Sequence, residues 1–161
     1  MIIMWKKIKP YAISILISLG VGGLSAWVTR DNMTVFDTVE KPPLTPPAIL
    51  FPIVWTILYV LMGISAARIY PNEARCPREV KSALTVYGAT LFLNFMWSVI
   101  FFNFRAFLIS FLWLLILWIV ILIMIRRFWK IEKLSAYLQI PYLIWVTFAG
   151  YLNLAIYLLN R

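Results

Sequence analysis

The side chains available for chemistry in this sequence are mainly aromatic rings and neutral polar groups. The 161 residues include no histidine and a single cysteine, Cys76. Zinc and copper sites are usually built from clusters of His and Cys, and Ser-His-Asp and Cys-His mechanisms need a histidine as base. We therefore predict no metal site and no catalytic residue of these classes.

Tryptophan, tyrosine and asparagine recur at helical spacing in three apolar segments. One stripe holds Trp55 and Tyr59, and another holds Trp145 and Asn153, at multiples of four residues that keep each stripe on one face of a helix. Such stripes are often core packing, and an amide inside a span often bonds one helix to the next. If the faces meet, they form an apolar wall with a few placed polar atoms, the usual make-up of a small-molecule pocket. The predicted ligand-binding residues are Trp55, Tyr59, Asn94, Trp97, Ser98, Tyr142, Trp145, Ala149 and Asn153.

The elements that carry these residues are expected to be membrane-spanning helices. Hydrophobic residues make up 63% of the chain and charged residues 13%, whereas soluble domains have about 45–50% and about 25%. A soluble or a disordered chain is therefore excluded. A helix needs about 20 apolar residues to cross a bilayer, and five stretches reach this length, at about 8–28, 48–70, 82–102, 106–125 and 134–159. We predict an all-α membrane protein, a single integral membrane domain that forms a five-transmembrane-helix bundle.

The net charge of +9 is distributed unevenly over this predicted topology. Eleven of the fifteen basic residues fall at the N-terminus or in the loops after the second and fourth spans, on one side of the membrane. Because cytoplasmic loops are enriched in Lys and Arg, we predict a multi-pass protein of the bacterial cell membrane with a cytoplasmic N-terminus and an outer C-terminus. This topology explains the basic charge without a nucleic-acid partner. The eleven residues are Lys6, Lys7, Lys9, Arg68, Arg75, Arg78, Lys81, Arg126, Arg127, Lys130 and Lys133.

The loop before the second span is long and rich in proline. An outer loop of about 18 residues is unusual in so compact a protein, and loops of this length are often lids or binding loops. Its prolines stiffen the chain into an extended backbone, and Thr45 is placed to cap the helix that follows. We favour a lid over a plain tether. The predicted lid residues are Pro42, Pro43, Leu44, Pro46 and Pro47.

Three local features predict how the last three spans are arranged. Only Asn103, Phe104 and Arg105 join the third and fourth spans, so these spans must be antiparallel neighbours. Pro141 lies inside the fifth span and should kink it, because proline removes a backbone hydrogen bond. The fourth span has Ser110 as its only hydroxyl, so we predict that it faces lipid and has little role in a site.

Three motifs follow one another along the chain. The first is Lys41-Pro42-Pro43-x-x-Pro46-Pro47, followed by Phe51-x-x-Val54-Trp55-x-x-Leu58-Tyr59-x-x-Met62-Gly63. The second is Leu93-Asn94-x-x-Trp97-Ser98-x-x-Phe101-Phe102, and the third is Pro141-Tyr142-x-x-Trp145-x-x-Phe148-Ala149-x-x-Leu152-Asn153. In this order they resemble the translocator protein family, also called the TspO/MBR or tryptophan-rich sensory protein family. The resemblance covers nearly the whole chain.

The resemblance implies a homodimeric five-helix bundle whose pocket is capped by the first loop. It implies that the pocket binds porphyrins such as protoporphyrin IX and benzodiazepine-site compounds, with no required cofactor. It gives pocket roles to Asn94 and Ala149, and it implicates Trp55 and Trp145 in a light-dependent breakdown of porphyrin. Family members often have an aromatic residue beside the first proline pair, where this chain has Leu44. We therefore expect fewer aromatic contacts from this lid.

The last span also fits a loose cholesterol pattern, through Leu154, Tyr157 and Arg161. Such patterns are weak. A tyrosine and an arginine at the end of a last helix are expected as anchors at the membrane interface in any case. We favour the anchor over a sterol site.

The function that these observations favour is an integral membrane receptor or transporter for porphyrin or another lipophilic small molecule, in contact with membrane lipid. One alternative is a light-dependent porphyrin-degrading enzyme that uses Trp55 and Trp145, because the spans hold no histidine or acid for ordinary acid–base chemistry. A second alternative is a membrane scaffold or regulator that binds a protein partner through the basic loops.

Overall fold

The computed structural model describes residues 2–161, with side chains from residue 7 onward. Five segments are long and apolar enough to cross a membrane, which confirms the all-α membrane fold predicted from composition. The helices are α1 (Ile2–Thr29), α2 (Val35–Thr38), α3 (Leu50–Ile69), α4 (Pro77–Ser98), α5 (Phe107–Ile131), α6 (Lys133–Leu138) and α7 (Ile140–Leu159). Short 3-10 turns follow α1 and α3, and a π-helical turn, Val99–Asn103, ends α4.

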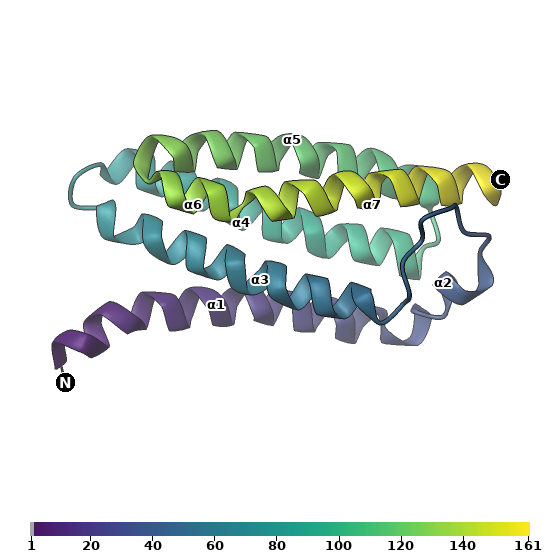
Figure 1. Cartoon of the computed structure of the whole chain (residues 1–161), viewed down its shortest axis with the longest axis horizontal. Helices are drawn as coiled ribbons and strands as arrows, with labels where there is room; N and C mark the ends of the chain where they lie inside the picture. The colour runs from purple at the N-terminus through teal and green to yellow at the C-terminus, as the bar shows by residue number, and fades with distance from the viewer. Residues whose placement is uncertain (1) are drawn as a thin grey trace.

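The spanning helices form a closed ring in which each span packs against two neighbours. Helix α1 packs on α3 and α4, α3 packs on α6, α6 and α7 pack on α5, and α5 packs on α4. The two termini lie at opposite ends of this bundle (Figure 1). We call these the N-terminal end, which also holds the α3–α4 and α5–α6 connections, and the C-terminal end, which also holds α2.

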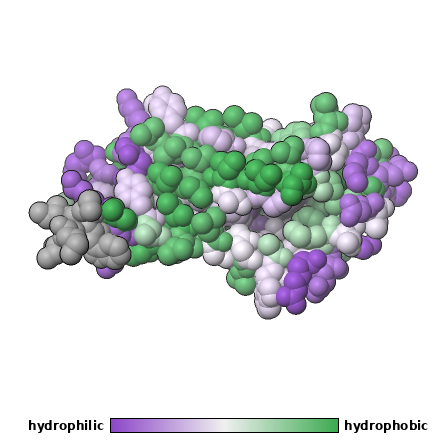
Figure 2. All heavy atoms as spheres, turned by 60° about the horizontal axis from the view of Figure 1, so that its bottom comes forward, coloured by the Kyte–Doolittle hydropathy of each residue, from purple (hydrophilic) through white to green (hydrophobic). Residues whose placement is uncertain are grey.

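An apolar surface covers the middle of the bundle. Figure 2 shows hydrophobic side chains over the central part of the visible face and hydrophilic ones gathered at both ends. Lipid-facing residues include Leu16, Ile57, Ile109 and Ile144, each more than half exposed. This pattern is expected where the hydrocarbon of a bilayer takes the place of water as solvent.

Small residues let α1 and α3 approach closely. A Cβ atom added at Gly63 would lie 2.5 Å from the Cα atom of Ile15, so only glycine fits at this crossing. On α1, Gly22 lies against the ring of Tyr59, and the buried Ser18 hydroxyl is hydrogen-bonded to Tyr87 on α4. Gly22 and Ser18 of α1 therefore lie in a seam inside the bundle, where small residues let membrane helices pack closely.

The fifth span is broken at Gln139, two residues before Pro141. Helix α6 ends at Leu138 and α7 begins at Ile140, which confirms the predicted kink. Within the last span, α3 packs mainly on α6 and has few contacts with α7. The break thus lets α7 diverge from α3 toward the C-terminal end, and large aromatic side chains occupy the space between them.

Helix α5 exposes apolar side chains such as Ile109 and Leu112, as predicted for a lipid-facing helix, but it also contributes to the core, which was not predicted. One side of it is buried, including Ser110, Leu117 and Ile121, none of which is exposed at all. It packs against α4 on one flank and α6–α7 on the other. Composition could not show this, because an all-apolar helix has no polar face to distinguish lipid from core. The short α4–α5 connection is as predicted, and Arg105 there adopts a positive φ of 49°.

A bidentate ion pair closes the N-terminal end. Arg68 Nε and Nη2 lie 3.0 Å and 3.3 Å from the two carboxylate oxygens of Glu132. The same carboxylate accepts from the Ser135 backbone N–H at 2.7 Å and so caps α6. The hydrogen bond from Arg68, with those from Ser135, outweighs partial burial and lowers the pKa of Glu132 from 4.5 to about 2.

Candidate functional site

Aromatic rings from α3 and α7 fill the space where these helices diverge. The ring centroid of Trp55 lies 6.3 Å from that of Tyr142 and 5.7 Å from that of Tyr59. One turn nearer the C-terminal end, Phe51 lies 5.8 Å from Trp145 in an edge-on arrangement. The two helices are thus joined by side chains rather than by close backbone contact, and aromatic edge-to-face packing is favourable in such a gap.

Polar atoms of this aromatic region lack partners. Asn94 on α4 donates through Nδ2 to the Tyr59 hydroxyl at 2.6 Å. Its Oδ1 atom has no hydrogen-bond partner among the described residues, and neither do the buried Tyr142 hydroxyl and the Trp145 Nε1 atom. Buried polar groups are nearly always hydrogen-bonded, so three unpaired atoms in one region are unusual. We call Phe51, Trp55, Tyr59, Asn94, Tyr142 and Trp145 the open cluster.

Two other predicted site residues belong to a different and fully bonded group. Asn153, which is 1% exposed, accepts at Oδ1 from Trp97 Nε1 and from the Ser110 hydroxyl, both at 3.0 Å. Its Nδ2 atom donates to the Phe107 carbonyl at 2.8 Å. These bonds join α4, α5 and α7. We call Trp97, Ser110 and Asn153 the closed cluster, because the amide of Asn153 has protein partners at both of its polar atoms.

The remaining predicted pocket residues lie beside the two clusters. Ala149 is buried on α7, one turn from Trp145 and one turn from Asn153. The hydroxyl of Ser98 donates to the Asn94 carbonyl of its own helix at 3.4 Å. Neither residue makes a contact with the rings or unpaired atoms of the open cluster that would assign it a role in binding. They stay predictions.

The proline-rich loop is fastened to the end of α7. The Tyr151 hydroxyl donates to the Pro43 carbonyl at 2.9 Å, and Asn160 exchanges two hydrogen bonds with the Glu40 backbone at 2.9 Å and 3.0 Å. In Figure 1 the chain after α2 crosses the C-terminal end toward α7 before it descends to α3. Leu44, at the tip, is 81% exposed and has a positive φ of 68°. The loop thus covers the end of the bundle nearest the open cluster.

Thr45 does not cap the next helix, contrary to the prediction. Its hydroxyl donates to the Pro42 carbonyl at 2.6 Å, and α3 begins only at Leu50, after an uncapped Ile49. Two prolines follow Thr45, and the residue before a proline is held away from helical backbone angles. The threonine therefore stabilises a turn inside the loop.

An aromatic side chain does reach the open cluster from the loop region, although none stands beside the prolines. Phe36, on α2, lies 5.1 Å from Phe51 between ring centroids. The Lys41 ammonium lies 5.3 Å from the centre of the Phe36 ring. A positive charge thus stands at the outer edge of the aromatic region. Arg30 instead packs over Trp27 on α1 and pairs with Asp31.

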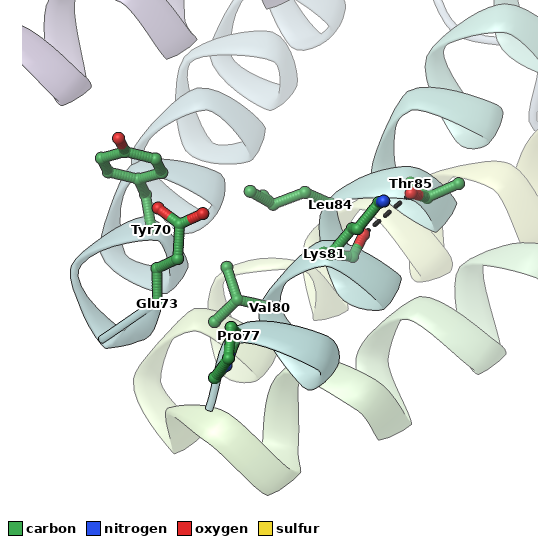
Figure 3. Close-up of a pocket in the computed structure, with 7 residues that line it drawn as sticks. All are labelled: Tyr70, Glu73, Pro77, Val80, Lys81, Leu84 and Thr85. Atoms are coloured by element: carbon green, nitrogen blue, oxygen red, sulfur yellow. Dashed lines mark hydrogen bonds between the residues drawn. The ribbon is translucent and has the colours of Figure 1, made fainter. Parts of the chain in front are cut away.

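Two surface hollows lie elsewhere, at the N-terminal end. One of about 460 Å³ separates the end of α3 from the start of α4, and Figure 3 shows its lining side chains from both segments around an open space. It brings together Glu73, Lys81 and the ring of Tyr70. The other, also about 460 Å³, lies on α5 beside Trp129. Neither hollow includes a predicted ligand-binding residue.

The loose cholesterol pattern is split by the end of the last helix. Tyr157 is half-buried on α7, whereas the helix ends at Leu159 and Arg161 lies exposed beyond it. Leu154 is half-buried. This arrangement agrees with an interface anchor.

Three residues of these regions were missed by the sequence reasoning. Ser110 is an isolated hydroxyl in an apolar span, and Phe36 lies outside the proline-rich segment, so no motif marks either of them. Gln139 was not considered, yet it is fully buried at the α6–α7 break and its amide has no partner among the described side chains. The signal was available, because an amide inside an apolar span should face the interior. Asn94 is predicted as a site residue by the same rule, that a polar residue in a span faces the interior.

Comparisons with known proteins agree with this architecture. Residues 13–159 match the TspO/MBR family. A tryptophan-rich protein TspO of Chlorobaculum tepidum is 35% identical over 96% of this chain and 98% of its own length. One from Archaeoglobus fulgidus is 37% identical over 91% and 94%, and the translocator protein of Bos taurus is 30% identical over 87% and 83%. The chain, a multi-pass membrane protein by its five apolar helices, therefore belongs to the TspO/MBR family.

Proposed function

We propose that this protein is a membrane receptor or transporter that binds a flat, apolar, partly anionic molecule, with protoporphyrin IX as the representative ligand, in the open cluster. The observation that carries the proposal is the set of unpaired buried atoms on Asn94, Tyr142 and Trp145, beside the ring of Trp55. The sequence motifs also predict that these residues bind a ligand. A cluster with spare hydrogen-bonding atoms can accept a ligand without giving up bonds inside the protein.

The shape and charge of the region support a planar anion of this kind. A macrocycle can stack on the rings of Trp55 and Trp145, and aromatic stacking is worth about 0.5–1.5 kcal/mol beyond burial of area. The carboxylates of such a ligand need a positive charge at the mouth, which Lys41 supplies beside Phe36. The loop tied to Tyr151 would then cover the bound molecule. Benzodiazepine-site compounds are a second ligand class suggested by the resemblance.

The direct test is a titration of the purified protein with protoporphyrin IX in detergent and in the dark, followed by tryptophan fluorescence. We expect saturable quenching that weakens at least about tenfold in the Trp55→Phe, Trp145→Phe variant, since both stacking rings lose part of their area and both lose their N–H donors. A Trp27→Phe, Trp129→Phe variant is the matched control, because both indoles lie exposed on the outer surface. Equal affinity in both double variants would refute the proposed site.

Repeating the titration under light tests the enzymatic alternative. The aromatic contacts of Trp55 with Tyr59 and Tyr142 offer a route for electrons toward a photo-excited ligand. If the protein degrades porphyrin, bleaching of the porphyrin will need light and both Trp55 and Trp145. Binding without light-dependent products assigns a receptor or transporter. Absence of any saturable binding would favour a scaffold that acts through a protein partner.

We also propose the orientation and assembly expected from the sequence. The basic residues of the α3–α4 and α5–α6 connections lie at the N-terminal end, which would face the cytoplasm. In a Cys76→Ala background, an impermeant thiol reagent applied to whole bacteria should label Leu44→Cys and leave Glu73→Cys unlabelled; the reverse would invert the orientation. A homodimer is proposed from the resemblance, and mass measurement in mild detergent tests it.

A further inference from the structure

Gln139 has a buried side chain that the bundle does not use. The residue is 0% exposed, and neither amide atom, Nε2 or Oε1, has a hydrogen-bond partner among residues 7–161. Its backbone is bonded, since its N–H donates to Ala136 at 3.1 Å and its carbonyl accepts from Leu143 at 3.2 Å. The unpaired groups therefore belong to the side chain alone, and they lie within a bilayer-spanning segment.

The pairing of α3 with α6–α7 gives the depth of Gln139. The helices of this pair run antiparallel: Trp55 lies beside Tyr142, and nearer the N-terminal end the Ser65 hydroxyl donates to the Ser135 carbonyl at 2.7 Å. Gln139 falls between Ser135 and Tyr142, so it lies level with the part of α3 that holds Tyr59. It is therefore one layer deeper than Trp55, on the side away from the proline-rich loop.

Gln139 shares a helix face with the open cluster. Gln139, Tyr142 and Val146 follow one another at three- and four-residue intervals and are all buried. The Tyr142 hydroxyl is unpaired as well, and so is Asn94 Oδ1. The inner side of the cluster thus offers donors, through the Gln139 and Tyr142 groups, and acceptors, through both amide oxygens. A leucine at position 139 would fill the same space without burying an amide, which is costly unless it is bonded.

The chemistry of this inner layer is neutral. Between residues 10 and 29 of α1, 50 and 67 of α3, and 134 and 159 of α6–α7, the sequence has no charged residue. At the N-terminal end these stretches are bordered by Lys9, Arg68 and Lys133. Arg68 is paired with Glu132, and the Lys133 ammonium lies over the ring of Trp129. A carboxylate placed here would have no counter-charge, whereas an uncharged carbonyl or N–H group would find a partner of either kind.

We propose that Gln139 and Tyr142 form an inner polar subsite of the ligand pocket, which hydrogen-bonds an uncharged amide-type group of a lipophilic ligand. This proposal rests on the proposed function and adds a selectivity to it. The pocket would then have two unlike ends: a cationic mouth at Lys41 for carboxylates and a neutral inner end for amides. The bound molecule would lie with its uncharged polar group toward the centre of the bilayer.

A matched pair of flat probes tests this. Benzanilide carries a planar amide, and trans-stilbene has nearly the same shape without one. Each is titrated as a competitor of protoporphyrin IX in the dark, against the wild type and Gln139→Met, which keeps the length of the side chain and removes its donors and acceptor. In the wild type we expect benzanilide to bind about fivefold tighter than stilbene, and Gln139→Met to abolish that preference without weakening stilbene.

Controls separate the possible failures. Thr147→Val removes a hydroxyl from an exposed position of α7 and should leave the preference unchanged. If Gln139→Met weakens both probes equally, or leaves the preference intact, the inner subsite is refuted while the pocket stands. If neither probe nor protoporphyrin IX binds the wild type in a saturable manner, the proposed function itself fails.

Thermal unfolding without ligand gives an independent readout. Ser65→Ala removes a hydroxyl that is bonded to the Ser135 carbonyl, so it should lower the midpoint of unfolding. Gln139→Met removes an amide with no protein partner, so the midpoint should stay the same or rise. A decrease as large as that of Ser65→Ala would show that the Gln139 amide is structural and would overturn the inference.

Discussion

Asn94 and Asn153 are similar in sequence and different in structure. Both are asparagines inside a membrane span, both are almost fully buried, and each contacts a ring from another helix. Asn153 is bonded at both of its polar atoms to groups on α4 and α5. Asn94 uses its Nδ2 atom and leaves Oδ1 unpaired. One amide holds helices together, and the other keeps hydrogen-bonding capacity free.

The difference follows from how the helices meet. The closed cluster lies where α4, α5 and α7 converge, and there the Phe107 carbonyl at the start of α5 accepts a hydrogen bond from Asn153 Nδ2. The open cluster lies where α7 diverges from α3 after the break at Gln139. Converging helices saturate an amide with neighbours, whereas diverging helices leave part of it for another molecule.

The strongest test of the comparison is Asn153→Leu against Asn94→Leu. The first change removes three interhelical hydrogen bonds, each worth about 0.6 kcal/mol in membrane proteins, so we expect about 2 kcal/mol of destabilisation. The second removes one bond to Tyr59 and an already unpaired oxygen, so its effect on unfolding should be much smaller. Unfolding in mixed micelles by a denaturing detergent measures both. Equal loss of stability would mean that the two clusters do not differ in kind.

The Arg68–Glu132 ion pair at the N-terminal end should have a smaller effect on stability, and that effect should depend on pH. The pKa of Glu132 is about 2 in the folded protein against an ordinary value of 4.5, chiefly because of its hydrogen bond from Arg68. Its contribution is therefore complete above pH 4.5 and is lost as pH falls toward 2. Because both side chains are partly exposed, we expect about 1 kcal/mol.

The measurement for this pair is the unfolding midpoint between pH 6 and pH 3, in the wild type and in Glu132→Gln. The variant should be less stable at pH 6 and less dependent on pH below 4.5. Asn153→Leu should keep the wild-type pH dependence, because an amide does not titrate in this range. A pH profile unchanged by Glu132→Gln would show that another group is responsible.

The smallest expected effect is that of Gly22→Ala on α1, which should reach the open cluster and not the closed one. Alanine at Gly22 would place a Cβ atom 2.5 Å from the ring of Tyr59. The ring must then shift, which disturbs the hydrogen bond that its hydroxyl accepts from Asn94. We expect protoporphyrin IX affinity to fall about threefold to fivefold, close to 1 kcal/mol, while the closed cluster is unaffected. Gly20→Ala, with no atom near the added Cβ, is the control. Equal affinity in the two variants would separate Tyr59 from the binding site.

Much of the fold could be read from local sequence. Apolar length was sufficient for five spans, because a bilayer allows few backbone arrangements other than helices. Pro141 predicted the break in the last span, because its effect on the backbone is local. Local sequence did not determine the role of Thr45 or the buried side of α5. A cap depends on where the next helix begins, and the buried side of an all-apolar helix depends on its neighbours.

The sequence by itself thus determined that this chain is a five-helix membrane protein of the TspO/MBR family. The length of an apolar segment and the spacing of a motif are both properties of the sequence that do not depend on tertiary contacts. Only the tertiary structure decided which polar groups are satisfied. Asn153, Asn94 and Gln139 all look alike as amides in apolar spans, because hydrogen-bond partners come from other helices. Their partners depend on where helices converge or diverge, and a break at one residue of the last span sets that geometry.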